Sequence, residues 1–184
     1  MSDYRKCLRV ASIVLGMVIS TAATSKLVAQ GGGKARRLAA PAAQPSLEPA
    51  RTMLRNFVGR WRVEVRFAGN FDGAPDASGT RVVTALFDDL RLQWTEELDS
   101  SRVKSQGMIG FDSRSGRFYG TAVDSTGSGA ELLTGTLDLA EPVIIFGPAA
   151  LSTDPSFILR MIDADHFTWA PLDRGWRAVL TRER

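Results

Sequence analysis

Histidine and cysteine, two residue types on which many catalytic and metal sites depend, are almost absent from this 184-residue chain, which holds one of each. The histidine, His166, stands in "DADHFTW" beside Asp163 and Asp165, and that composition predicts a solvated turn. A Ser-His-Asp triad through His166 stays open as an alternative. With so few ligands a zinc site of the usual His/Cys kind cannot be assembled. We expect neither a metal nor a cofactor.

Carboxylates and glycine-rich stretches offer little more. Glu96 and Glu97 are neighbours on a predicted strand, so they face opposite sides and do not form a pair. Glu96 shares a side with Trp94, and we expect it to be an exposed carboxylate at the rim. The stretch "DSTGSG" at 124–129 lacks the lysine of a phosphate-binding loop and precedes a strand, so it predicts a turn. No catalytic residue is expected, and a protein that is not an enzyme is favoured.

What remains is a set of aromatic and long side chains suited to lining a cavity. Small barrels are either filled by side chains or hold one small ligand. An arginine inside an apolar run could meet an anionic head group. The alternative for every member is ordinary core packing. The candidate ligand-binding residues are Trp94, Met108, Tyr119, Arg160, Trp169 and Trp176.

The elements that must position these residues are strands. Runs that alternate apolar and polar residues are separated by short stretches rich in Gly, Asp, Ser and Pro. Such connections leave no room for crossover helices, which excludes a parallel sheet. We predict an all-β fold, an antiparallel up-and-down barrel of eight to ten strands, preceded by a short helix over 48–57 with Pro49 in its first turn. The predicted strands are 60–68, 79–87, 90–98, 104–111, 117–124, 130–138, 142–147, 156–162, 166–170 and 175–182.

The sequence pI of about 9.4 suggests nucleic-acid binding until the charge is located. Residues 1–30 carry four basic groups and one acidic group, and the rest of the chain then holds 19 of the 23 basic and 19 of the 20 acidic residues. A domain without net positive charge lacks the electrostatic footprint that phosphate binding needs. We therefore expect no nucleic-acid partner.

The N-terminus has the three-part pattern of a secretory signal. A basic segment ending at Arg9 precedes the apolar run "VASIVLGMVIS" at 10–20, and small residues follow. We predict a signal peptide over 1–30, a disordered linker over 31–50 and one barrel domain over 51–184. The alternative is an uncleaved anchor, although the uncharged run is shorter than a spanning helix requires. The mature protein would be periplasmic or extracellular, without stable membrane insertion, and without a thiol because Cys7 is removed.

Four motifs occur in a characteristic order: Gly59-x-Trp61, "GFD" at 110–112, "YGTAVDSTGSG" at 119–129 and "LTRE" at 180–183. In this order the chain resembles a bacterial family of exported, lipocalin-like domains of unknown function, which are calycin-type β-barrels, over about residues 50–184. It departs from that family at 88–89, where two aspartates replace glycines. The resemblance implies that Trp61 plugs one end of the barrel and that Arg182 lies across it. It also leaves open a haem ligand at His166, as in some ten-stranded barrels.

Three functions fit these observations. The first is an exported barrel that binds a small apolar or amphipathic molecule. The second is a filled barrel with a structural or partner-binding role. The third is an enzyme on the same barrel, which would use Glu96 or His166 together with Tyr119 in the lumen. The sequence favours the first and carries no signal for the oligomeric state.

Overall fold

The computed structural model describes residues 47–99, 103–127, 130–149 and 157–184. The predicted signal peptide over 1–30 lies outside these residues, as does the predicted linker up to residue 46. Residues 47–50, which the linker prediction included, belong to helix α2 (Leu47–Phe57). The short helix predicted for 48–57 is therefore present, with Pro49 in its first turn.

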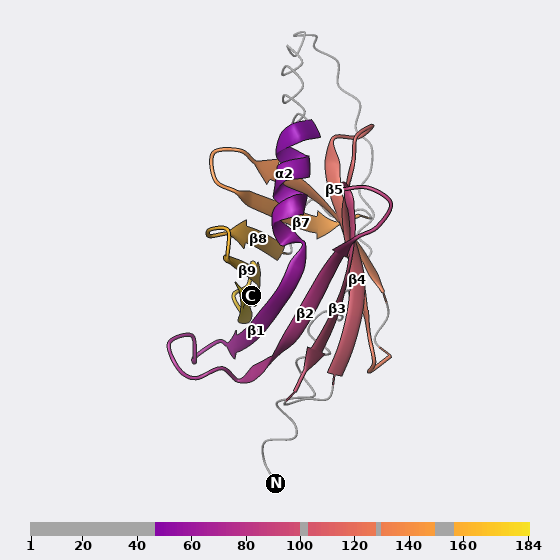
Figure 1. Ribbon diagram of the computed structural model, residues 1–184. Coiled ribbons are helices and arrows are strands. Elements are labelled where there is room, and N and C mark those ends of the chain that lie inside the picture. Colours follow the sequence, from indigo (N-terminus) through magenta and orange to yellow (C-terminus); the bar gives the residue numbers. More distant parts are fainter. Residues whose placement is uncertain (1–46, 100–102, 128–129, 150–156) are drawn as a thin grey trace, which may run out of the picture.

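Ten antiparallel strands follow α2 and close into a barrel in which each strand pairs with its neighbours in the sequence and β1 pairs with β10 (Figure 1). This confirms the predicted all-β, up-and-down barrel with a short N-terminal helix. Each predicted strand lies within two residues of the observed bounds. The strands are β1 (Gly59–Phe67), β2 (Ala77–Ala85), β3 (Arg91–Leu98), β4 (Val103–Asp112), β5 (Arg117–Asp124), β6 (Glu131–Asp138), β7 (Val143–Pro148), β8 (Phe157–Met161), β9 (His166–Pro171) and β10 (Trp176–Arg182).

Closure depends on the pairing of the first strand with the last. Trp61 lies opposite Arg182 and Phe67 lies opposite Trp176, so β1 and β10 pair over seven positions. A closed barrel has no unpaired edge along which another chain could add a strand. The pairing predicted between the two ends of the domain is confirmed.

Alternation along β1 separates the inside of the barrel from the outside. Trp61, Val63 and Val65 are buried, each no more than 5% exposed. The intervening charges lie on the outer face, where Glu64 pairs with Arg66 at 2.9 Å and also with Arg62. The stripe of charge in this strand thus serves the solvated face, and the apolar residues face the lumen.

Helix α2 covers one end of the barrel, which we call the helix end (Figure 1). It is amphipathic and buries Ala50, Met53, Leu54 and Phe57. Its polar face is tied to the β2–β3 turn by Asp89, which accepts a 2.8 Å hydrogen bond from Arg51 Nε and pairs with Arg55. Desolvation acts to raise the pKa of Asp89, but the hydrogen bonds from the two guanidinium groups prevail and hold it below its ordinary value.

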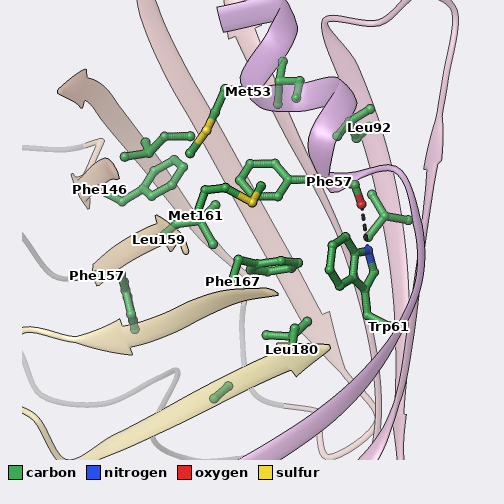
Figure 2. Close-up of a cluster of buried hydrophobic side chains, with 14 of the residues drawn as sticks. Met53, Phe57, Trp61, Leu92, Phe146, Phe157, Leu159, Met161, Phe167 and Leu180 are labelled. Carbon is green, nitrogen blue, oxygen red and sulfur yellow. Dashed lines mark hydrogen bonds between the residues drawn. The ribbon is translucent and has the colours of Figure 1, made fainter. Parts of the chain in front are cut away.

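The core at the helix end is aromatic. Figure 2 shows Phe167 of β9 beneath Phe57 of α2 and beside Trp61 of β1. Phe167 meets both rings edge-on, with centroids 5.1 Å from Phe57 and 4.6 Å from Trp61. Edge-to-face contacts of this kind add to the stabilisation from apolar burial. Among the described residues, no helix is long and apolar enough to cross a membrane.

Candidate functional site

Two arginine–tryptophan pairs lie on the inner face of the barrel, and the first closes the helix end. Trp61 is fully buried, and its indole N–H donates to the Phe57 carbonyl at 2.9 Å, the bond drawn in Figure 2. The Arg182 guanidinium lies over this ring, 4.1 Å from the centroid. The resemblance to lipocalin-like barrels implied this contact. We call Trp61 and Arg182 the closing pair.

Arg182 of the closing pair also bonds to the backbone around it. Its Nη1 donates to the Val58 carbonyl at 2.8 Å, its Nη2 to Asn56 at 2.7 Å and its Nε to Ala164 at 3.1 Å. Each of the three guanidinium nitrogens therefore has a backbone acceptor, at the C-terminal end of α2, in the α2–β1 connection or in the β8–β9 turn. The side chain joins both segments to the end of β10.

Gly59 leaves the space that this arginine occupies. Its φ is +143°, a conformation that residues with a side chain rarely adopt. A Cβ at this position would lie 2.5 Å from Arg182 Nη1. The Gly-x-Trp motif is thus accounted for by the closing pair: the tryptophan supplies the ring and the glycine admits the arginine.

Beyond the helix-end core, the barrel encloses a cavity of about 180 Å³. Its surface is mostly apolar and is formed by residues of all ten strands, together with Phe57 of α2. Aromatic rings from β7 to β10 form one wall. Phe157 and Trp169 stack there at 5.5 Å, Phe146 lies 5.5 Å from Trp169, and Trp176 lies 6.4 Å from Phe157. The residues of this aromatic wall that line the cavity are Phe146, Phe157, Trp169 and Trp176.

The opposite wall carries a polar row across β2 to β5. Arg81 lies opposite Glu96, Glu96 opposite Ser105 and Ser105 opposite Asp124, so one ladder position holds all four on the inner face. All four line the cavity. The row leads from the cavity wall near Trp61 toward the end of β5, where Asp124 Oδ1 accepts a bond from the Thr126 amide at 2.8 Å.

The second arginine–tryptophan pair belongs to this polar wall. Arg81 lies over Trp94, 4.5 Å from the ring centroid, and its Nε and Nη2 both reach Glu96 Oε2, at 2.8 and 2.7 Å. The Trp94 ring rests on β4, where a Cβ on Gly107 would lie 2.6 Å from it. We call Arg81, Trp94 and Glu96 the lumen triad.

Three of the six candidate ligand-binding residues line this cavity with their side chains: Trp94, Trp169 and Trp176. Met108 borders it, but its side chain is 43% exposed and its ladder partner Gln93 lies on the outer face. We place the Met108 side chain outside, because β4 has Gly107 and Ile109 on the inner face.

Tyr119 and Arg160 do not line the cavity, and their placement in the lumen is corrected. Each follows a residue whose side chain faces the lumen, and successive side chains of a strand point to opposite faces, so both lie on the outer face. Tyr119 lies across Gly110, where a Cβ would lie 2.3 Å from its hydroxyl. Arg160 is paired with Glu141 at 2.7 Å and is 43% exposed.

His166 begins β9 at the β8–β9 turn, as its sequence context predicted. Its Nδ1 lies 2.8 Å from Asp163 Oδ1, and the ring alternates with the inward Phe167, so it faces away from the lumen. Bonds from the Asp165 amide and then from His166 lower the pKa of Asp163. The enzyme hypothesis required two polar groups to converge in the lumen, and neither His166 nor Tyr119 lies there.

Glu96 was expected at the exposed rim, and this is wrong. Its side chain is 11% exposed and that of its partner Arg81 is 15% exposed. Arg81 is a further residue of this site, and it was not among the residues predicted from the sequence. The sequence could have revealed this pair. If the predicted strands 79–87 and 90–98 form an antiparallel hairpin with residue 79 opposite residue 98, Arg81 lies opposite Glu96.

Comparison with known proteins gives a family but no activity. Residues 46–154 match the model of a family described as "Protein of unknown function (DUF1579)". The matched segment runs from α2 to the β7–β8 connection, so Arg81 and Glu96 lie inside it and Arg182 lies beyond it. No curated protein matches the chain.

Proposed function

The chain belongs to the DUF1579 family of proteins of unknown function, and from the geometry of its lumen we propose that it is a binding module that holds one small apolar or amphipathic molecule inside the barrel. The observation that carries the proposal is the cavity of about 180 Å³ between an aromatic wall and a polar row. A dry apolar cavity of about 150 Å³ is large enough for benzene. The lumen therefore suits a molecule the size of one ring or a short chain.

The walls have the composition of a ligand site. Pockets for small molecules are mostly apolar, with a few polar groups that fix the orientation of the ligand. The aromatic wall supplies apolar contact, and Arg81 and Glu96 supply polar groups at the opposite side. A filled barrel, the second hypothesis, would place side chains in this volume.

The setting of this activity is part of the proposal. A closed ten-stranded barrel whose first strand bears Trp61 and whose last strand bears Arg182 supports a lipocalin-like assignment. The basic and apolar segments before residue 25 support export, so that the ligand would be met outside the cytoplasm. N-terminal sequencing of the protein from its own host tests export: a start between residues 24 and 31 is expected, and an intact Met1 in a cytosolic fraction would contradict it.

Native mass spectrometry of the protein purified from its own host tests binding. We expect a fraction of the protein to carry a non-covalent adduct of small mass, released by collisional activation. Gly120→Val tests whether the adduct lies in the cavity. Gly120 lines the cavity, and a Cβ there would lie at an ordinary contact distance, 3.6 Å, from Phe146. The added methyl groups would therefore occupy the lumen. The folded variant should lose the adduct. Thr80→Val, on the outer face of β2, should keep it.

A further inference from the structure

The lumen triad holds polar atoms that the barrel itself does not use. Arg81 bonds to Glu96 through Nε and Nη2, and both bonds reach Oε2. Among the described residues, none hydrogen-bonds to Arg81 Nη1 or to Glu96 Oε1. Neither atom is fully buried. In the described part of the chain, a fully buried side-chain nitrogen or oxygen without a hydrogen-bond partner is found only at Nε of Arg177. The pair thus leaves one donor and one acceptor accessible at the cavity wall.

The charge of this pair limits what can bind beside it. Arg81 and Glu96 neutralise each other, and both are more than four-fifths buried. A charged ligand end would lose its hydration and meet a like charge as well as an opposite one. The position does not favour a net charge of either sign.

A neutral end that both donates and accepts fits the two unused atoms. A primary amide or a hydroxyl group can accept from Arg81 Nη1 and donate to Glu96 Oε1, and it satisfies both without a charge. The apolar body would then lie between Trp94 and the aromatic wall, where Phe157, Trp169 and Trp176 line the cavity. Hydrogen bonds to charged groups are stronger than those between neutral groups.

We propose that the lumen selects small neutral molecules with a hydrogen-bonding end, of the carboxamide or alcohol class, over carboxylates and amines of the same size. This specificity rests on the proposed function. In this proposal the Arg81–Glu96 pair forms the hydrogen bonds to the polar end of the ligand. The closing pair at the helix end takes no part, because Arg182 is bonded to backbone carbonyls.

Four probes that share one benzene ring test the selectivity: benzamide, benzoate, benzylammonium and toluene. Titration of the full chain at pH 7, followed by calorimetry, should rank benzamide tightest, with an affinity about 10-fold above that of toluene, the ratio expected for about 1.4 kcal/mol from the added hydrogen bonds. Benzoate and benzylammonium should bind more weakly than toluene. A charged probe that binds tightest would overturn the proposal, and this comparison needs no variant.

Two variants that each remove one charge of the pair should change which probe binds tightest. Glu96→Gln removes the negative charge beside Arg81, so benzoate should gain about 10-fold relative to benzamide. Arg81→Gln leaves Glu96 unpaired, so benzylammonium should gain by a similar factor. Glu64→Gln is the matched control: it removes an ion-paired carboxylate on the outer face of β1 and should leave all four affinities unchanged.

The outcomes separate this proposal from the one on which it rests. If toluene binds but the four probes do not differ, or if the variants leave the order unchanged, the lumen is a binding site and the selectivity is wrong. If none of the four probes binds, the proposed function fails as well. The proposal stands only if benzamide binds tightest to the wild type, Glu96→Gln shifts the order toward benzoate and Arg81→Gln shifts it toward benzylammonium.

Discussion

The two arginine–tryptophan pairs in this barrel make the same kind of contact but differ in their surroundings. At the helix end Arg182 lies 4.1 Å from the Trp61 ring, and in the lumen Arg81 lies 4.5 Å from the Trp94 ring. Each is accompanied by a glycine on the same or the next strand, where a Cβ would meet the arginine or the indole. The residue types are therefore the same in both regions.

The two regions differ in how many of their polar atoms already have a hydrogen-bond partner within the protein. In the closing pair, the Trp61 indole N–H and each guanidinium nitrogen of Arg182 have backbone acceptors, and Trp61 is fully buried. In the lumen triad, Arg81 Nη1 and Glu96 Oε1 have no hydrogen-bond partner among the described residues, all three side chains line the cavity, and Trp94 is only partly buried. A satisfied pair stabilises the fold, whereas an unsatisfied pair beside a cavity can receive a ligand. The number of satisfied polar atoms thus distinguishes the pair that holds the helix end from the pair that we propose receives a ligand.

The largest effect is expected from deleting the buried ring. Trp61→Ala should lower the free energy of unfolding by about 3–5 kcal/mol, the usual range for a buried aromatic. Trp94→Ala should cost less, because that ring already borders a cavity and loses fewer contacts. Urea denaturation of both variants checks the difference. Equal losses would remove the distinction between the two regions.

Removal of the closing arginine comes next. Arg182→Ala should cost about 1.5–3 kcal/mol, because charged hydrogen bonds to three carbonyls are lost along with the ring contact. Arg182→Lys should restore only part, since an ammonium group cannot stack as a planar guanidinium does. In a double-mutant cycle with Trp61→Ala the losses should be non-additive. Strict additivity would show that the two side chains are not coupled.

Backbone strain at the motif glycine gives a similar or smaller effect. Gly59→Ala should cost about 1–3 kcal/mol, because alanine disfavours the positive φ and its Cβ would meet Arg182 Nη1. Gly69→Ala is the matched control: its φ is also positive, at +90°, but nothing lies within 4 Å of its Cβ. Thermal denaturation should show a larger loss for Gly59→Ala. Equal losses would mean that strain alone acts and that space for Arg182 does not matter.

The smallest effect concerns the attachment of α2. Because the pKa of Asp89 is lowered in the folded state, its contribution to stability is present above the unfolded pKa and is lost as the pH falls through the folded one, from about pH 5 downward. Asp89→Asn should therefore lower the melting temperature modestly at pH 7, and the difference from wild type should shrink toward pH 3. A difference that stays constant with pH would contradict this account.

Local patterns were sufficient to predict the strands and the barrel. Alternation and turn residues are encoded within a few positions, so each of the ten strands was placed within two residues. The closing pair needed the first and last strands to meet, and the resemblance to a barrel family supplied that. The tie between Asp89 and α2 joins segments 38 positions apart, and nothing in the local pattern pointed to it.

The cavity was harder to predict because core and lumen residues occupy the same face. Trp94, Trp169 and Trp176 were identified correctly as lining residues by type, but Tyr119 and Arg160 were placed one position out of phase. Arg81 and Glu96 become a pair only when the hairpin register is drawn. Whether side chains fill a barrel depends on summed volumes across ten strands, which periodicity does not contain.

The four tryptophans of the chain allow one direct measurement of the central claim that the lumen, and not the closed helix end, receives the ligand. In a ¹⁵N-labelled sample the indole N–H signals can be followed while toluene or benzamide is added. We expect the signals of Trp94, Trp169 and Trp176, which line the cavity, to shift with saturation. The chemical shift of the Trp61 signal should not change, because its indole N–H is hydrogen-bonded to the Phe57 carbonyl. Movement of Trp61 alone, or no movement of the other three at saturating probe, would contradict the account.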